Sequence, residues 1–127
     1  MDLSFARRLK IMRATILPSL VLLFLIASPI YLTDINEIEL EPTAAVEVIW
    51  KDAMQACNSY GADWSLPSIY QLAAIYYRRP DIALVKQTDY WSRNSFAGFA
   101  FGLNTGRGIA SFDRHSDTDH YLCVKLK

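Results

Sequence analysis

The chain has 127 residues, and its 13 basic side chains balance its 13 acidic ones, so the net charge is zero. Four of the basic residues and one acidic residue precede residue 14, which leaves nine basic against twelve acidic residues in the rest of the chain. This mildly acidic remainder has no basic stripe, which argues against nucleic-acid binding. The 94 residues from Asp34 to Lys127 are enough for one domain with a modest core.

Residues 14–32 contain no charged side chain and are almost all apolar. Nineteen residues at helical rise span about 28 Å, close to the thickness of the hydrocarbon core of a bilayer. The sequence therefore predicts a transmembrane helix over 14–32. A basic tail, 1–13, precedes it and acidic residues follow it, so the amino terminus is expected in the cytoplasm. We predict a single-pass, signal-anchored protein of the bacterial inner membrane with a periplasmic carboxyl-terminal domain.

A cleaved signal peptide is the alternative reading of the same segment. Ala27 and Ser28 offer a weak cleavage site, but Pro29 follows at once and the chain stays apolar to Leu32. The length of the apolar run favours an anchor that is retained. No cysteine lies near residue 28, so a lipoprotein anchor is excluded.

Two helices are predicted after a short polar stalk, 33–42. The first begins with Thr43 as its N-cap and stops at Gly61, and its inner face repeats at three- and four-residue steps over Val46, Ile49, Trp50, Ala53, Cys57 and Tyr60. The second begins with a capping box between Ser68 and Gln71 and ends before Pro80. Its inner face is expected to comprise Leu72, Ile75 and Tyr76.

Strand patterns replace the helical ones after Pro80. A short strand is predicted over 89–92 and a second over 99–103, followed by a turn over 104–108 whose residues accept positive φ. The chain returns as a strand over 109–112, continues as a polar loop over 114–119 and closes with a strand over 121–126. Because helices come first and an antiparallel sheet follows, the fold class is predicted to be α+β.

The two cysteines lie at opposite ends of the predicted domain, Cys57 on the first helix and Cys123 in the last strand. Outside the cytoplasm, and without a Cys-x-x-Cys spacing, such a pair is typical of a structural disulfide. A bond between them would enclose about 65 residues and stabilise the fold by about 4 kcal/mol in the chain-entropy model.

Four motifs occur in an order that resembles the DUF1566 family, also called the Lcl C-terminal domain. They are Trp50-Lys51-Asp52-Ala53 before Cys57, Asp63-Trp64-Ser65-Leu66-Pro67-Ser68 before Leu72, Tyr90-Trp91-Ser92 with Phe101-Gly102-Leu103-Asn104-Thr105-Gly106, and Tyr121-Leu122-Cys123-Val124. The resemblance covers residues 46–126 and implies that 43–127 form a small C-type-lectin-like domain. The chain departs from the family in having Ser65 where the family usually has Arg, and Gln71 where it usually has Glu.

Chemistry-bearing residues are dense only between Arg114 and His120, where two His and two Asp lie within six residues. Their spacing matches no structural zinc pattern and no EF-hand loop, and a solvated loop explains it equally well. The motifs of calcium-dependent sugar binding are absent, although Asn104, Asp113, Asp117 and Asp119 could share a surface. We predict no metal site and no cofactor. Nucleophile motifs and phosphate-binding glycine loops are also missing, so we predict that the protein is not an enzyme.

Two functions from different classes remain. The first is a binding module that recognises a protein or glycan ligand, as in adhesion, through the side chains of Arg93, Phe96, Arg114 and His115 on two loops. The second is an accessory structural subunit of a bacterial envelope assembly, such as a secretion, conjugation or pilus-type machine, with the membrane helix in the interface. The tryptophans, Trp50, Trp64 and Trp91, are assigned to the core with their indole nitrogens bonded to backbone carbonyls.

Overall fold

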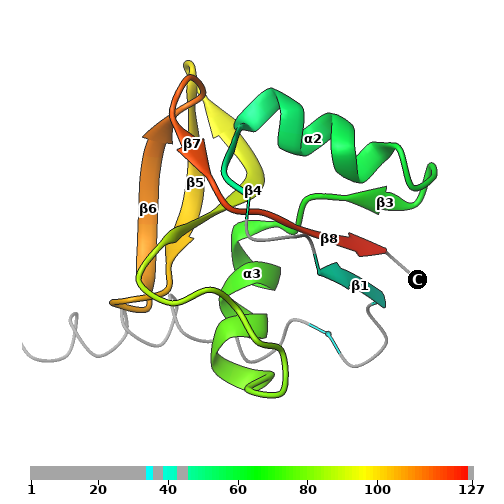
Figure 1. Ribbon diagram of the computed structural model, residues 1–127, viewed down its shortest axis with the longest axis vertical. Coiled ribbons are helices and arrows are strands. Elements are labelled where there is room, and N and C mark those ends of the chain that lie inside the picture. The colour runs from blue at the N-terminus through cyan, green and yellow to red at the C-terminus, as the bar shows by residue number, and fades with distance from the viewer. Residues whose placement is uncertain (1–33, 36–38, 43–45, 126–127) are drawn as a thin grey trace, which may run out of the picture. The chain divides into compact units, whose positions relative to one another are not determined.

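The computed structural model describes residues 34–35, 39–42 and 46–125 (Figure 1). The predicted cytoplasmic tail (1–13) and transmembrane helix (14–32) lie outside these ranges, so both stay predictions. Within the described ranges, no helix is long and apolar enough to cross a membrane. The described residues all belong to one unit of structure.

The first helix, α2, spans Trp50–Asn58 and is shorter than the sequence predicts. The predicted start at Thr43 is wrong, because Val48–Ile49 form a short strand, β2, that pairs antiparallel with β7 (Thr118–Asp119). Ile49 keeps an extended backbone as the N-cap, with no side chain that caps the helix. Both residues are β-branched, and pairing with a distant strand overrides the helical spacing of the segment.

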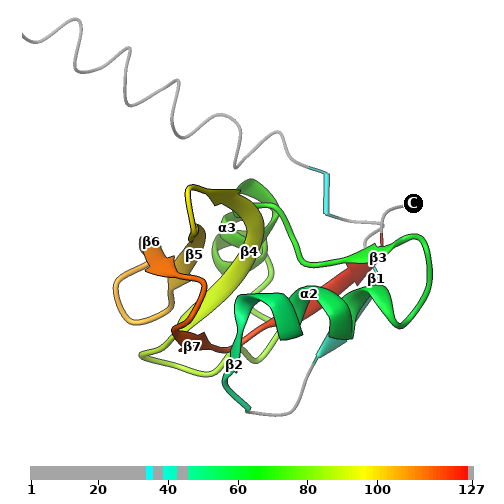
Figure 2. The ribbon, with the colours of Figure 1, turned by 90° about the horizontal axis from the view of Figure 1, so that it is seen from above.

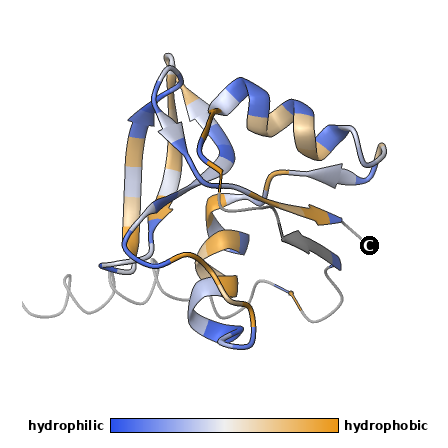
Figure 3. Ribbon diagram, viewed as in Figure 1, coloured by the Kyte–Doolittle hydropathy of each residue, from blue (hydrophilic) through white to orange (hydrophobic). Residues whose placement is uncertain are grey.

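The second helix, α3, spans Ile69–Arg78, as predicted. Ser68 is its N-cap and forms the predicted capping box, in which the Ser68 hydroxyl accepts a hydrogen bond from the Gln71 backbone and the Gln71 side chain accepts one from the Ser68 backbone. Its inner face buries Leu72 and Ile75. Figure 3 shows that α3 is mostly hydrophobic until its hydrophilic end, whereas hydrophilic and hydrophobic residues alternate along α2.

The largest sheet has the strand order β4-β5-β6 and is antiparallel, with β4 at Asp89–Phe96, β5 at Phe99–Asn104 and β6 at Ile109–Arg114. β4 is longer than the predicted strand at 89–92. The segment from Asn94 to Phe99 is therefore the tip of a hairpin with a two-residue turn, not a loop. Both turn residues have positive φ, 53° at Ala97 and 81° at Gly98, as a tight hairpin turn requires.

A second sheet has the order β1-β8-β3, with β1 at Glu39–Pro42, β8 at Leu122–Lys125 and β3 at Trp64–Ser65. β1 pairs antiparallel with β8, from Glu39 opposite Lys125 to Pro42 opposite Leu122. These four residues were expected in the stalk, but they form an edge strand of the domain. The polar segment 114–119 also differs from the prediction, because its last two residues form β7.

The core lies between the sheets and the two helices, α2 and α3. Cys57 and Cys123 are bonded to each other, which confirms the predicted disulfide. The buried cluster around the bond consists of Ala53, Cys57, Leu66, Trp91, Ala100 and Cys123. α3 lies on one side of the β4-β5-β6 sheet and α2 with β7 on the other, while β6 is the outer edge (Figures 1 and 2). The α+β class, with two helices and antiparallel sheets, is confirmed for the described residues.

Candidate functional site

Four phenylalanines share one face of the β4-β5-β6 sheet near the tip of its hairpin. The strand register places Phe96 opposite Phe99 and Phe101 opposite Phe112. The Phe99 and Phe112 rings stack with their centroids 5.0 Å apart, and the Phe101 and Phe112 rings lie 4.7 Å apart. We call Phe96, Phe99, Phe101 and Phe112 the aromatic patch.

The aromatic patch is open to solvent although its members are large and apolar. Phe96 is 73% exposed, Phe112 47% and Phe101 39%. Farther along β5 the same face is covered, and Leu103 there is only 2% exposed. Clustered apolar side chains that a fold leaves uncovered are typical of interaction sites. Arg114 lies directly opposite Phe99 and is exposed, so a cationic side chain borders the patch.

The structure brings together two of the four predicted ligand-binding residues. Phe96 belongs to the aromatic patch and Arg114 borders it. Arg93 instead braces the start of α3, because its Nη1 donates to Gln71 Oε1 at 3.2 Å. His115 is half-buried and stacks on the Trp50 ring, with centroids 4.2 Å apart and planes at 9°. Arg93 and His115 therefore have structural contacts of their own.

Trp50 and Trp91 behave as the sequence analysis expects. Trp91 is fully buried, and its indole nitrogen donates to the Val48 carbonyl oxygen at 2.8 Å. Trp50 donates to the Ser92 carbonyl oxygen at 2.9 Å. Trp64 packs against the core cluster from β3. Because all three tryptophan rings pack in or against the core, the exposed aromatic surface on this sheet consists of phenylalanine side chains and not of tryptophan.

Three carboxylates from three strands converge on the opposite face of the same sheet. Asp89 begins β4, Asp113 lies in β6 and Asp119 ends β7, and one ligand atom of each lies within 4.8 Å of the others. We call these residues the carboxylate cluster. Asn104, the β5 partner of Asp89 in the strand register, donates to Asp89 Oδ1 at 2.8 Å.

Asp119 carries the largest electrostatic perturbation in the cluster. Asp119 is only 8% exposed to solvent. Burial, followed by the negative charges of Asp113 and Asp89, raises the pKa of Asp119 from 3.8 to about 7. A carboxyl group in this setting either keeps a proton near neutral pH or needs a nearby positive charge.

The two histidines of the 114–120 segment do not join the carboxylate cluster. His120 is buried, and its Nδ1 lies 2.9 Å from Thr88 Oγ1 and 3.6 Å from Glu47 Oε1. The His115 ring stacks on the Trp50 ring. Asp117 Oδ2 accepts from the Arg114 backbone at 3.1 Å and shapes the turn. The imidazole and carboxylate groups that are dense in the sequence therefore separate in the fold, and only Asp119 points toward the other carboxylates.

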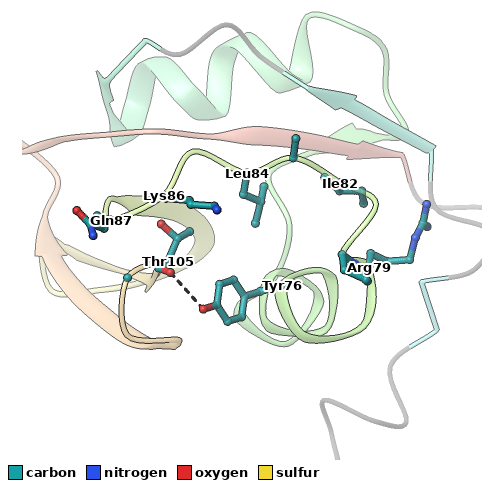
Figure 4. Close-up of a pocket in the computed structure, with 10 residues that line it drawn as sticks. Tyr76, Arg79, Ile82, Leu84, Lys86, Gln87 and Thr105 are labelled. Atoms are coloured by element: carbon teal, nitrogen blue, oxygen red, sulfur yellow. Dashed lines mark hydrogen bonds between the residues drawn. The ribbon is translucent and has the colours of Figure 1, made fainter.

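A pocket of about 580 Å³ lies beside the end of α3 (Figure 4). Its walls come from α3, from the segment 79–87 and from the turn after β5. Tyr76 donates to the Thr105 carbonyl oxygen at 3.1 Å, and Arg79 forms an ion pair with Asp81 at 2.8 Å. The Tyr76 hydroxyl and the Arg79 guanidinium therefore each have a partner within the protein. No role was predicted for residues 81–87.

Comparison with known proteins adds no functional assignment. No protein-family model matches the chain, and no curated protein sequence matches it. The resemblance to DUF1566 over residues 46–126 stays a prediction that rests on the motifs themselves.

Sequence reasoning named Asp113 and Asp119 as residues that could share a surface but missed Asp89. The available signal was the spacing on neighbouring strands, since Asp89 and Asn104 face each other at one end of the β4–β5 hairpin. It also treated Phe101 and Phe112 only as strand residues. The exposure of Phe101 and Phe112 depends on how far along the sheet α3 packs, and the local sequence pattern does not specify this.

Proposed function

We propose that this protein is a non-enzymatic binding module, anchored in the inner membrane by residues 14–32, that recognises a protein or glycan ligand outside the cytoplasm. The aromatic patch is the binding surface in this proposal, and Arg114 contributes charge at its border. The exposure of Phe96, Phe101 and Phe112 on one sheet face is the observation that carries the argument.

The physical case for the patch rests on what its exposure costs and offers. Phenylalanine rings in water lose the free energy that burial would supply, on the order of 1.5–3 kcal/mol for each fully buried side chain. Rings fixed in a sheet are already ordered, so a ligand that covers them pays little conformational entropy. Phenylalanine and arginine are both enriched at the cores of protein interfaces. The aromatic patch supplies the first kind, and Arg114 at its border supplies the second.

The finer fold assignment belongs to the same proposal. A C-type-lectin-like domain of the DUF1566 kind is supported by two helices followed by an antiparallel sheet and by a disulfide from the first helix to the last strand. Gln71 stands where that family usually has Glu, and it completes the capping box. Ser65, which stands where that family usually has Arg, donates to the adjacent Leu66 carbonyl oxygen at 2.9 Å.

The test compares variants of the full-length chain purified from solubilised membranes. Phe112→Ala and Phe96→Ala are expected to lower co-purification of the partner, or retention on immobilised glycans, at least tenfold. Tyr60→Ala is the matched control, because Tyr60 is a 51% exposed aromatic residue at the far end of α2. Melting temperatures within about 2 °C of the wild type would show that the folds are intact.

Binding that survives both phenylalanine substitutions and the double variant contradicts the proposal. If the partner is then lost on substitution within residues 14–32, recognition occurs in the bilayer and the protein is an accessory subunit of an envelope assembly. Reporter fusions at Lys127 test the topology separately. They should be active only outside the cytoplasm, and activity in the cytosol would reverse the assignment.

A further inference from the structure

The carboxylate cluster places negative charge where the protein supplies little compensation. Asp89, Asp113 and Asp119 come from three different strands, and none of them takes part in an ion pair with a basic residue among the residues that the structure describes. Asp117 lies close enough to add to the repulsion felt by Asp119. Bringing like charges together in a half-buried site is unfavourable unless a positive charge is shared between them.

A second, independent observation concerns unsatisfied polar atoms. Among the described residues, buried side-chain nitrogen or oxygen atoms without a hydrogen-bond partner are confined to one segment and are Ser111 Oγ, Asp113 Oδ2, His115 Nε2 and Asp119 Oδ2. Two of these four atoms belong to the carboxylate cluster. Asp119 is 8% exposed, so its unpartnered oxygen is held within the protein, and one of its carboxylate oxygens lies within 4.8 Å of those of Asp89 and Asp113. Buried polar atoms of this kind require a partner, and an ion is one that a protein-only hydrogen-bond list omits.

The site is partly pre-organised. The side-chain Nδ2 of Asn104 fixes Asp89 by donating to its Oδ1 at 2.8 Å. The Asn104 side chain is itself held in place, because its Oδ1 accepts from the backbone nitrogens of Gly106 and Arg107. Gly102, between the strands that carry Asp89 and Asp113, has no side chain to fill this face. An added Cβ there would lie 2.7 Å from Ser111 Oγ.

The donor chemistry selects among cations. All three donors are carboxylate oxygens, which suit hard cations, whereas structural zinc is usually held by sulfur and imidazole nitrogen. The donor atoms of the cluster all lie within 4.8 Å of one another, so one ion can bridge them. Calcium accepts several carboxylates in a flexible geometry, whereas magnesium usually binds one or two carboxylates and keeps several waters. Three carboxylates from three strands therefore favour calcium.

We propose that Asp89, Asp113 and Asp119 bind one divalent cation, Ca²⁺. The ion neutralises part of the charge of the three carboxylates and supplies the partner that Asp113 Oδ2 and Asp119 Oδ2 lack. It also links β4, β6 and β7, none of which is a neighbour of the other two in the sheets. This site lies on the opposite sheet face from the aromatic patch, so the inference does not depend on what the patch binds.

The experiment uses the full-length chain in detergent, stripped with EDTA and desalted, with CaCl₂ as the probe. Titration calorimetry is expected to give one site per chain with a dissociation constant on the order of 10⁻⁴–10⁻³ M. At 5 mM CaCl₂ the melting temperature, followed by tryptophan fluorescence, is expected to rise by about 4–18 °C over that range of dissociation constants. MgCl₂ at the same concentration should give less than half of that rise.

Variants separate the site from general effects of salt. Asp119→Asn should lose the calcium-dependent rise, while Asp63→Asn, which removes the same charge from an exposed residue outside the cluster, should keep it. Asp113→Asn gives the same reading should Asp119→Asn fail to fold. A melting temperature that responds to pH and not to CaCl₂ overturns the proposal, because a shared proton then replaces the ion. An equal rise in Asp119→Asn overturns it as well, and an equal rise with MgCl₂ overturns the assignment to calcium.

Discussion

Replacing Asp119 by Asn should remove a strong pH dependence from the stability of the metal-free protein. Burial and the charges of Asp113 and Asp89 raise the pKa of Asp119 from 3.8 in the unfolded chain to about 7 in the fold. Between about pH 4 and pH 7 the folded state therefore holds a proton that the unfolded chain has released. The free energy of unfolding must fall as the pH rises through this window and become level above it.

The size of this effect follows from the two pKa values. Each pKa unit is worth about 1.4 kcal/mol, so a rise from 3.8 to about 7 corresponds to about 4 kcal/mol. We expect a loss of about 2–4 kcal/mol between pH 4 and pH 8, the lower value applying if the carboxylates move apart when Asp119 ionises. Asparagine cannot ionise and resembles the protonated acid in shape. The variant should match the wild type at pH 4 and exceed it at pH 8.

Urea unfolding in EDTA at pH 4, 6 and 8, followed by tryptophan fluorescence, measures the difference between wild type and variant directly. Comparing the two proteins at each pH cancels the titration of groups that they share. Asp63→Asn serves as the control and should differ from the wild type by a constant amount. A difference for Asp119→Asn that does not change with pH, or that grows toward low pH, refutes the reasoning.

Three further variants test the scaffold. Cys57→Ala combined with Cys123→Ala should lower the free energy of unfolding by about 2–5 kcal/mol in urea titrations, and free thiols in non-reducing mass spectrometry of the wild type would contradict the disulfide. Gly102→Ala should cost about 1–3 kcal/mol, because its Cβ would collide with the Tyr90 carbonyl oxygen and with Ser111 Oγ; an unchanged melting temperature would mean that this face is not closely packed. Ala97→Gly should gain about 0.5–1 kcal/mol, since Ala97 has a φ of 53° that glycine adopts without strain. A lower melting temperature for that variant would argue against the positive φ.

Local signals predicted the parts of the fold that are decided locally. The capping box of α3 needs only Ser68 and Gln71, three residues apart, and it is present as expected. The turn over 104–108 was also predictable from local sequence, since Asn104 Oδ1 accepts from the backbone nitrogens of Gly106 and Arg107 within the turn itself. The disulfide was also accessible, because a domain with two cysteines has one possible internal pairing.

Features that depend on distant pairing were missed. Val46 and Ile49 fit the helical spacing of α2, but Val48 and Ile49 pair with β7, about 70 residues later in the chain, and Val46 is left 53% exposed. β1 lies in a segment whose composition suggests a stalk, and its strand character comes from β8. Asp113 and Asp119 were expected to share a surface, but their convergence with Asp89 depends on how three strands pack together, which periodicity does not specify.

The disulfide also determines how the domain would respond to mechanical tension. Cys57 and Cys123 are separated by 66 positions in the chain. At about 3.5 Å per extended residue, the disulfide prevents about 230 Å of chain from being extended when the two ends of the domain are pulled apart. Tension would detach β1 from β8 and straighten α2 up to Cys57, and extension would stop there. Under load in an oxidising compartment, the hairpin that carries the aromatic patch is therefore shielded from the force, and a reducing agent would turn a short, limited extension into complete unravelling.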